Sequence, residues 1–198
     1  MKIKKKDTKP LNNKSNKNTN IDYETLSEEN LDIAIKIQNQ IFPLENGSED
    51  LKESLFKTSE NYLYLKYWLP KIDDEYIGIC GLYVNKFAPK DVWVGWFGVL
   101  PEFQRKGYGM AILKFLEETG KELGYETIRL YSDEVKYAIA GKLYEKFGMI
   151  NELYDCPDDK WFKYSNTLIY SKSLTNKPVK LWGNKNLYLG AHDAKNKK

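Results

Sequence analysis

The stretch VLPEFQRKGYG, residues 99–109, decides the fold expected of this chain. An apolar run interrupted by glycine, from Trp93 to Val99, leads into it, and an amphipathic helical pattern from Met110 to Leu123 follows it. The stretch is therefore typical of a turn between a strand and the N-terminus of a helix. The first N–H groups of a helix lack partners within the helix, and the helix dipole favours negative charge there. The sequence thus predicts an anion site, best suited to a phosphate.

Two glycines give this turn its expected shape. Gly107 and Gly109 let the main chain approach a pyrophosphate closely, with the amides of residues 105–110 as donors. Arg105 and Lys106 add positive charge at the rim. The spacing matches neither the phosphate-loop nor the dinucleotide-binding fingerprint, so the turn alone predicts no particular ligand.

The apolar run before the turn contains two further glycines, Gly95 and Gly98. Glycine inside a strand is unfavourable and often marks a bulge or a close backbone approach. The alternative is that these glycines make room for Trp93, Trp96 and Phe97. In either case we expect the strand to leave regular pairing near its C-terminal end. Backbone groups freed there could bond an extended ligand as another strand would.

Hydrophobic periodicity predicts a mixed α/β fold. Strands are expected at 21–25, 62–69, 76–84, 92–100, 127–131 and 167–173, and helices at 27–42, 50–58, 110–123 and 137–147. Ser27 is the expected cap of the first helix, and Gly124 the expected end of the third. This order of elements indicates a central sheet covered by helices.

Length and charge indicate one domain with two polar ends. The chain has 198 residues and a net charge of +3, but residues 1–20 carry +6, residues 176–198 carry +5, and the body between them carries −8. Residues 1–20 are rich in Lys and Asn and have the composition of a disordered basic tail. The acidic body argues against a nucleic-acid-binding face. We expect a domain at 21–175 and a C-terminal extension at 176–198, whose apolar part, Trp182 to Leu189, packs on the domain or on a second subunit.

Several classes of protein are disfavoured. Two cysteines and a single histidine give neither a disulfide framework nor a zinc-ligand set, so no metal is expected. No apolar run has the length of a membrane span, and the basic N-terminus lacks the apolar core of a signal peptide. We therefore expect a cytoplasmic protein with no membrane partner.

The stretch at 99–109 resembles the central motif of the GNAT superfamily, the acyl-CoA-dependent N-acetyltransferases. In the family a strand ending Val-x-Pro is followed by Gln or Arg, two residues, Gly, one residue, and Gly or Ala. This sequence has Val99 and Pro101, then Gln104, Gly107 and Gly109.

A second motif lies on a later helix. The family pattern Asn-x-x-Ala-x-x-x-Tyr-x-x-x-Gly-Phe is matched by Ala140, Tyr144 and Gly148, with Met149 in place of Phe. Two motifs in the right order make the resemblance specific over residues 75–150. The resemblance implies a mostly antiparallel central sheet with helices on both faces, and acetyl-CoA as cosubstrate.

The resemblance also implies roles for single residues. Phe97 and Val99 would bond the pantetheine arm through their backbones. The pyrophosphate would be held by the turn and the start of its helix: Gln104, Arg105, Lys106, Gly107, Tyr108, Gly109 and Met110. The phenol of Tyr144 would donate a proton, or a hydrogen bond, to the departing CoA thiolate. From its position alone, Tyr144 could equally be a packed aromatic of its helix.

Two departures from the family pattern leave the base unassigned. Tyr137 stands where the family has Asn, and Trp93 stands where some members carry a general-base Glu. An amine of pKa about 10 must lose a proton before it attacks. Asp133 and Glu134 are acidic candidates by topology, but the alternative for both, a solvated loop or a helix N-cap, is preferred.

The acceptor pocket is expected to be aromatic and acidic, which suits a cationic amine. The candidates are Trp93, Trp96, Tyr62, Tyr64 and Tyr67, with charge from Asp73, Asp74 and Glu75. The alternative is that these aromatics fill the core or a dimer interface.

The sequence thus predicts an N-acetyltransferase that acts on a small-molecule or peptide amine by direct attack in a ternary complex. A homodimer is compatible with the sequence. The alternatives are a non-catalytic acyl-CoA-binding sensor and, less favoured, a nucleic-acid binder with basic tails.

Overall fold

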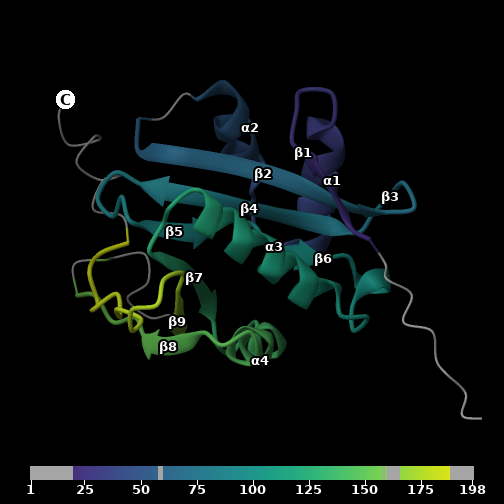
Figure 1. Ribbon diagram of the computed structural model, residues 1–198. Coiled ribbons are helices and arrows are strands. Elements are labelled where there is room, and N and C mark those ends of the chain that lie inside the picture. The colour runs from purple at the N-terminus through teal and green to yellow at the C-terminus, as the bar shows by residue number, and fades with distance from the viewer. Residues whose placement is uncertain (1–19, 58–59, 158, 160–165, 188–198) are drawn as a thin grey trace, which may run out of the picture.

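The computed structural model describes residues 20–57, 60–157, 159 and 166–187 (Figure 1). Its helices are α1 (Leu31–Ile41), α2 (Ser48–Phe56), α3 (Tyr108–Glu122) and α4 (Ala138–Lys146), with a short 3-10 turn at Pro101–Phe103. Its strands are β1 (Asp22–Thr25), β2 (Tyr62–Ile72), β3 (Glu75–Tyr76), β4 (Gly78–Asn85), β5 (Asp91–Val94), β6 (Gly98–Val99), β7 (Thr127–Asp133), β8 (Ile150–Leu153) and β9 (Thr167–Ser173).

The strands form one sheet in the order β1-β2-β4-β5-β7-β9-β8, with β3 paired to β2 and β6 paired to β4. All of these pairs are antiparallel except β5 and β7, which run parallel. The expected mixed α/β fold with a mostly antiparallel sheet is therefore confirmed.

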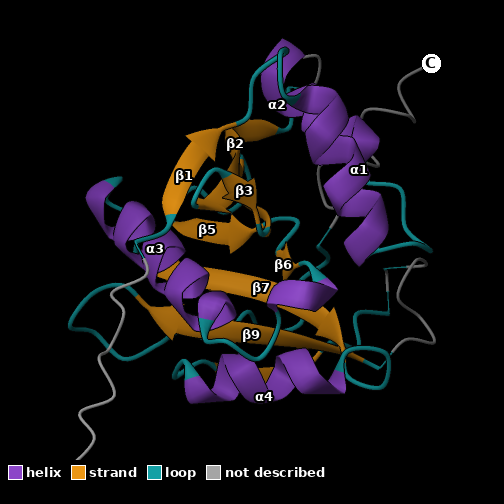
Figure 2. Cartoon of the chain, turned by 90° about the vertical axis from the view of Figure 1, so that its right-hand side faces the viewer, coloured by secondary structure: helices purple, strands orange, loops and turns teal. Residues whose placement is uncertain are grey.

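Helices cover both faces of this sheet (Figure 2). Alternate residues of β2 point to opposite faces. Tyr67 and Leu69 pack under α1 and α2, whereas Trp68 packs in the cluster that contains α3 and α4. The cluster around α3 and α4 is the larger. Its buried helix residues are Ile112, Leu113, Leu116 and Tyr144, and Phe147 at the end of α4 joins them. Both helix motifs of the sequence therefore lie on the same face.

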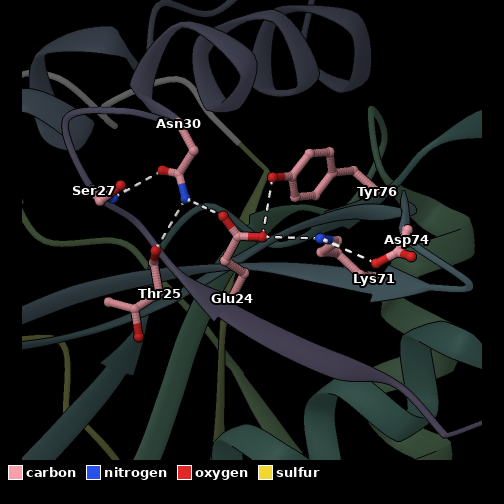
Figure 3. Close-up of polar contacts among 7 residues, drawn as sticks. All are labelled: Glu24, Thr25, Ser27, Asn30, Lys71, Asp74 and Tyr76. Carbon is pink, nitrogen blue, oxygen red and sulfur yellow. Dashed lines mark hydrogen bonds and ion pairs between the residues drawn. The ribbon is translucent and has the colours of Figure 1, made fainter.

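The entry to α1 differs from the prediction. Asn30, and not Ser27, stands at the N-cap position, although its side chain does not cap the helix. Its amide instead joins the turn to β1: Oδ1 accepts the Ser27 N–H at 2.8 Å, and Nδ2 donates to Glu24 Oε1 at 2.8 Å and to Thr25 O at 3.1 Å (Figure 3). These bonds close the turn before the helix, so α1 begins at Leu31. The amide of Asn30, with Lys71 and Tyr76, also holds the pKa of Glu24 below its usual value.

Other boundaries are close to those expected, with three exceptions. The strand predicted at 76–84 is divided at Ile77 into β3 and β4. The strand predicted at 92–100 is split into β5 and β6, which agrees with the departure from regular pairing expected near its C-terminal end. The edge strand β8 was not predicted, because Ile150 to Leu153 is short, and two of its four residues are polar. The basic tail lies outside the described residues except for Asn20, as do Tyr188 and Leu189.

The described part of the C-terminal extension, residues 176–187, packs on the domain around the large side chain of Trp182. Trp182 is 6% exposed, and its ring lies 5.0 Å from that of Trp93 at an angle of 87°. Arg129, buried beneath it, pairs with Asp91 at 3.0 Å and donates to Ser171 at 2.6 Å. Among the residues that the structure describes, no helix combines the length and the apolar character needed to cross a bilayer.

Candidate active site

The two parallel strands at the centre of the sheet separate from each other. The last residue pair between β5 and β7 is Trp93 with Arg129, and the two strands do not pair beyond it. Beyond Val94 the chain bends away and returns to β4 as β6, whereas β7 continues along β9 to Asp133. This separation exposes backbone groups of both strands to one opening.

The break between β5 and β6 is held in place by side chains of other elements. The Gly95 N–H donates to Gly81 O at 2.9 Å. A Cβ at Gly95 would lie 2.8 Å from the Tyr67 hydroxyl, which hydrogen bonds to the backbone of Trp96. A Cβ at Gly98 would lie 2.5 Å from a methyl group of Ile41. The two glycines therefore lie at the break between β5 and β6. They also make room for other side chains, but these are Tyr67 and Ile41 rather than the three predicted aromatic residues.

The turn before α3 has the geometry of an anion cradle. Gly107 is the N-cap of α3 with φ of +91°, a conformation that favours glycine, and no side chain caps this helix. Nothing lies within 4 Å of a Cβ built on Gly107, whereas a Cβ on Gly109 would lie 3.0 Å from Leu143. Gly109 thus allows α3 and α4 to approach each other. Open space and uncapped N–H donors at the helix start fit a pyrophosphate group.

The exposed side chain of Gln104 bonds to the backbone beside the turn. Its Nε2 donates to Val99 O at 2.9 Å, and its own N–H donates to Pro101 O at 3.2 Å. The side chain therefore ties the turn to β6. A carbonyl oxygen has a second lone pair, so Val99 O can still accept another bond.

Tyr144 lies where α4 meets the opening. It is 7% exposed, and its ring centre lies 6.2 Å from that of Phe97 and 5.0 Å from that of Tyr170. Burial raises its pKa, and the nearby Tyr170 and Tyr137 add to the shift. The phenol therefore stays protonated at neutral pH, as a proton donor must.

A cavity of about 530 Å³ begins at this opening. Val94, Gly95 and Trp96 line one side of it, residues 131–133 another, and Tyr144 also contributes. The aromatic residues around it are Phe42, Tyr62, Tyr67, Tyr83, Phe87, Trp96, Tyr131 and Tyr137. It is therefore large enough for a small amine or for the end of a long side chain.

Three carboxylates line this cavity. Glu45 binds the ammonium group of Lys136 and the hydroxyl of Tyr137. Asp133 Oδ1 accepts the N–H groups of Val135 at 2.9 Å and Lys136 at 2.7 Å, so it closes the turn before α4, whose N-cap residue is Tyr137. Asp50 Oδ2 accepts the indole N–H of Trp96 at 2.8 Å.

Some predicted pocket residues lie elsewhere. Trp93 is fully buried against Trp182, and Tyr64 packs against Tyr125 on the face that α3 covers. The acidic loop, residues 73–75, joins β2 to β3 at the far end of β2 from Tyr62, so it is not a charge of this cavity. These predictions are wrong: Trp93 and Tyr64 pack in the core, and the length of β2 keeps the acidic loop away from the cavity.

The sequence did not point to Asp50 or Glu45. Both lie in or before α2, far along the chain from the two motifs. Only the pairing of β2 with β4, and the packing of the helices behind them, brings these carboxylates to the opening. Among the described residues, no group of three or more His, Cys, Asp or Glu could hold a metal ion.

Comparison with known proteins agrees with this geometry. Residues 31–149 match the model of the Acetyltransferase (GNAT) family. The chain belongs to this family of acetyltransferases. The resemblance predicted from the two motifs is therefore confirmed, and the match covers α1 through Met149.

Solved structures share the fold at low sequence identity. The ribosomal-protein-S18-alanine N-acetyltransferase of Escherichia coli is 17% identical with a TM-score of 0.60, over 82% of this chain and 99% of that one. The spermidine N-acetyltransferase of Vibrio cholerae, solved with CoA and spermine, is 17% identical with a TM-score of 0.61, over 78% and 95%. A GNAT-family acetyltransferase of Staphylococcus aureus is 19% identical with a TM-score of 0.62, over 79% and 100%. No curated protein matches the chain.

Proposed function

We propose that this protein transfers an acetyl group from acetyl-CoA to a primary amine by direct attack within a ternary complex. The observation that carries the proposal is the separation of β5 from β7, which opens a cavity of about 530 Å³ beside Tyr144. An extended thioester entering from the α3 side and an amine entering from the cavity would meet at that opening. Direct attack needs both substrates bound together in this way.

The acetyl-CoA site combines a strand edge with a helix start. The backbones of Phe97 and Val99 would bond the pantetheine arm, because β6 pairs with β4 along one edge and no described strand pairs with its other edge. The pyrophosphate would lie at the start of α3 against the amides of Arg105, Lys106, Gly107, Tyr108, Gly109 and Met110. Gln104 would hold this turn against β6 through Val99 O. Each negative charge near the helix start gains about 0.3–1 kcal/mol from the dipole.

Tyr144 is the proposed proton donor. Its burial keeps the phenol protonated, and its place beside Phe97 puts it next to the strand that would carry the pantetheine arm. Donation of a proton to the departing sulfur would let it leave as a thiol, which is a better leaving group than the thiolate. The acceptor is a small-molecule or peptide amine, which the aromatic walls and carboxylates of the cavity would attract as a cation.

Thiol release tests this proposal. The purified chain is mixed with acetyl-CoA and a panel of primary amines: 2-phenylethylamine, 1,4-diaminobutane and Nα-acetyl-lysine amide. We expect release of CoA thiol that depends on the amine, with the acetylated amine appearing in equal amount by mass spectrometry. Tight binding of CoA with no turnover of any amine, in a wider panel as well, would instead indicate a non-catalytic acyl-CoA sensor.

A further inference from the structure

The carboxylate of Asp50 differs from the other two carboxylates of the cavity. Glu45 is neutralised by Lys136, and Asp133 is occupied by two backbone N–H groups. Asp50 accepts only the neutral indole N–H of Trp96, and among the described residues no Lys or Arg forms an ion pair with it. It therefore brings an uncompensated negative charge to the cavity wall.

The position of Asp50 is fixed from two sides. It lies in the first turn of α2, and the indole that binds it belongs to Trp96, within the break between β5 and β6. Trp96 is held in turn by the ring of Phe42, at 5.0 Å, and by the hydrogen bond between its backbone and Tyr67. The carboxylate is thus held against the side chain of Trp96, the residue before the stretch that would carry the thioester.

A cation at Asp50 would be surrounded by aromatic rings. Trp96, Tyr62, Tyr67 and Phe42 line the cavity with it. Ring faces attract an ammonium group, and a partly desolvated carboxylate attracts it more strongly than one in water. An alcohol or a thiol of the same shape would gain neither interaction. The cavity wall at Asp50 therefore suits a primary ammonium group.

We propose that Asp50 binds the ammonium group of the acceptor and receives one of its protons. This assignment rests on the proposed acetyl transfer for its chemical step. The ammonium gives one proton to the Asp50 carboxylate, and the neutral nitrogen then attacks the acetyl carbon. The C–N bond forms and the C–S bond breaks, while Tyr144 protonates the sulfur. The second nitrogen proton returns through solvent to Tyr144, and Asp50 releases its proton to water.

The surroundings of Asp50 adapt it to accept a proton. Burial raises the pKa of its carboxyl, the Trp96 indole opposes the shift, and the charges of Glu49 and Glu53 reinforce it. A carboxyl with a raised pKa favours the protonated form in the native state, so its charge costs stability at neutral pH. The titratable groups on the walls near it are Glu49, Lys52, Glu53, Tyr62 and Tyr67. Those elsewhere around the cavity are Glu45, Tyr83, Tyr131, Asp133, Lys136, Tyr137 and Tyr144.

The first test is the variant Asp50→Asn, with Asp32→Asn as its control. Asn keeps an oxygen that can accept the Trp96 N–H, so a merely structural role predicts no change. We expect kcat/KM for the best amine of the panel to fall by about 10²-fold at neutral pH. The loss should shrink as pH rises toward about 10, because more acceptor then arrives as neutral amine. Asp32→Asn makes the same substitution in the first turn of α1, at an exposed position outside the cavity, and should change kcat/KM by less than about two-fold.

The second test measures binding and needs no turnover. Ligand-detected NMR compares 2-phenylethylamine with its neutral analogue 2-phenylethanol on wild type and on Asp50→Asn. We expect wild type to prefer the amine by about ten-fold or more, and the variant to lose this preference. The variant should be no less stable to heat than wild type.

These outcomes separate the two proposals. If wild type shows the preference, the variant loses it and no amine is turned over, acetyl transfer fails but Asp50 remains the ammonium site. If Asp50→Asn keeps the preference, or turns over amine at the wild-type rate at every pH, the assignment of Asp50 is overturned.

Discussion

At the scale of single residues, Tyr144 carries the chemistry that the two motifs imply. We expect Tyr144→Phe to lower kcat by about 10²-fold while the affinity for acetyl-CoA changes by less than about two-fold, since only the hydroxyl is lost. A thiol-release assay measures kcat, and calorimetric titration measures the affinity for acetyl-CoA. Tyr170→Phe is the control, because Tyr170 packs 5.0 Å from Tyr144 but does not line the cavity. Equal loss in both variants would assign the effect to packing.

Gly107 is the second residue on which the acetyl-CoA site depends. We expect Gly107→Val to weaken CoA binding by at least about ten-fold, because its branched side chain would occupy the space of the pyrophosphate. The variant would also carry left-handed strain of about 1–2 kcal/mol. Gly124→Val controls for that strain, since Gly124 at the other end of α3 has φ of +82° and equally open surroundings. CoA affinity that falls equally in both variants would contradict the phosphate assignment.

At this scale the sequence offers candidates for the proposed acetyl-CoA half of the site, but it does not offer Asp50 for the acceptor half. Gly107, Gly109 and Tyr144 belong to short motifs that can be read from neighbouring residues. Asp50 belongs to no motif. It reaches the cavity only because α2 packs behind β2, and periodicity does not encode contacts between distant segments.

At the scale of elements, the junction of β1 with α1 depends on one buried amide. Asn30 is 4% exposed and bonds to three groups of the preceding turn and strand. We expect Asn30→Ala to lower the free energy of unfolding by about 1–3 kcal/mol, because buried partners lose their hydrogen bonds. Denaturant titration followed by circular dichroism measures the change.

The matched control is Asn39→Ala, the same substitution at an exposed position of α1. It should leave stability unchanged or raise it by up to about 0.7 kcal/mol, since alanine is the better helix former. If Asn30→Ala costs no more than Asn39→Ala, the amide network contributes little to the fold.

Most elements were predictable because their patterns are strong. β9 matches the prediction at both ends, and α3 shows apolar residues at helical spacing. The errors fall where a local signal is overruled by tertiary structure. Ser27 is a good cap by type, but Asn30 closes the turn three residues later. β8 has little pattern of its own and exists as the partner of β9.

At the scale of the whole molecule, the C-terminal segment covers a buried charge. The ring of Trp182 lies 5.6 Å from the guanidinium group of Arg129, which is 2% exposed and paired with Asp91. A buried ion pair needs its surroundings intact, because water entering around it weakens the attraction between its charges. The segment after β9 therefore contributes Trp182 to the buried core around Trp93.

We expect Trp182→Ala to lower the free energy of unfolding by about 3–5 kcal/mol, the usual cost of removing a buried Trp side chain. Leu181→Ala is the control, since its side chain is 47% exposed and should contribute less than about 0.5 kcal/mol. Guanidinium titration of both variants measures the difference. Because the contact with Trp93 lies within one chain, the midpoint should not depend on protein concentration. A midpoint that rises with concentration would show instead that the segment stabilises the chain by packing between two subunits.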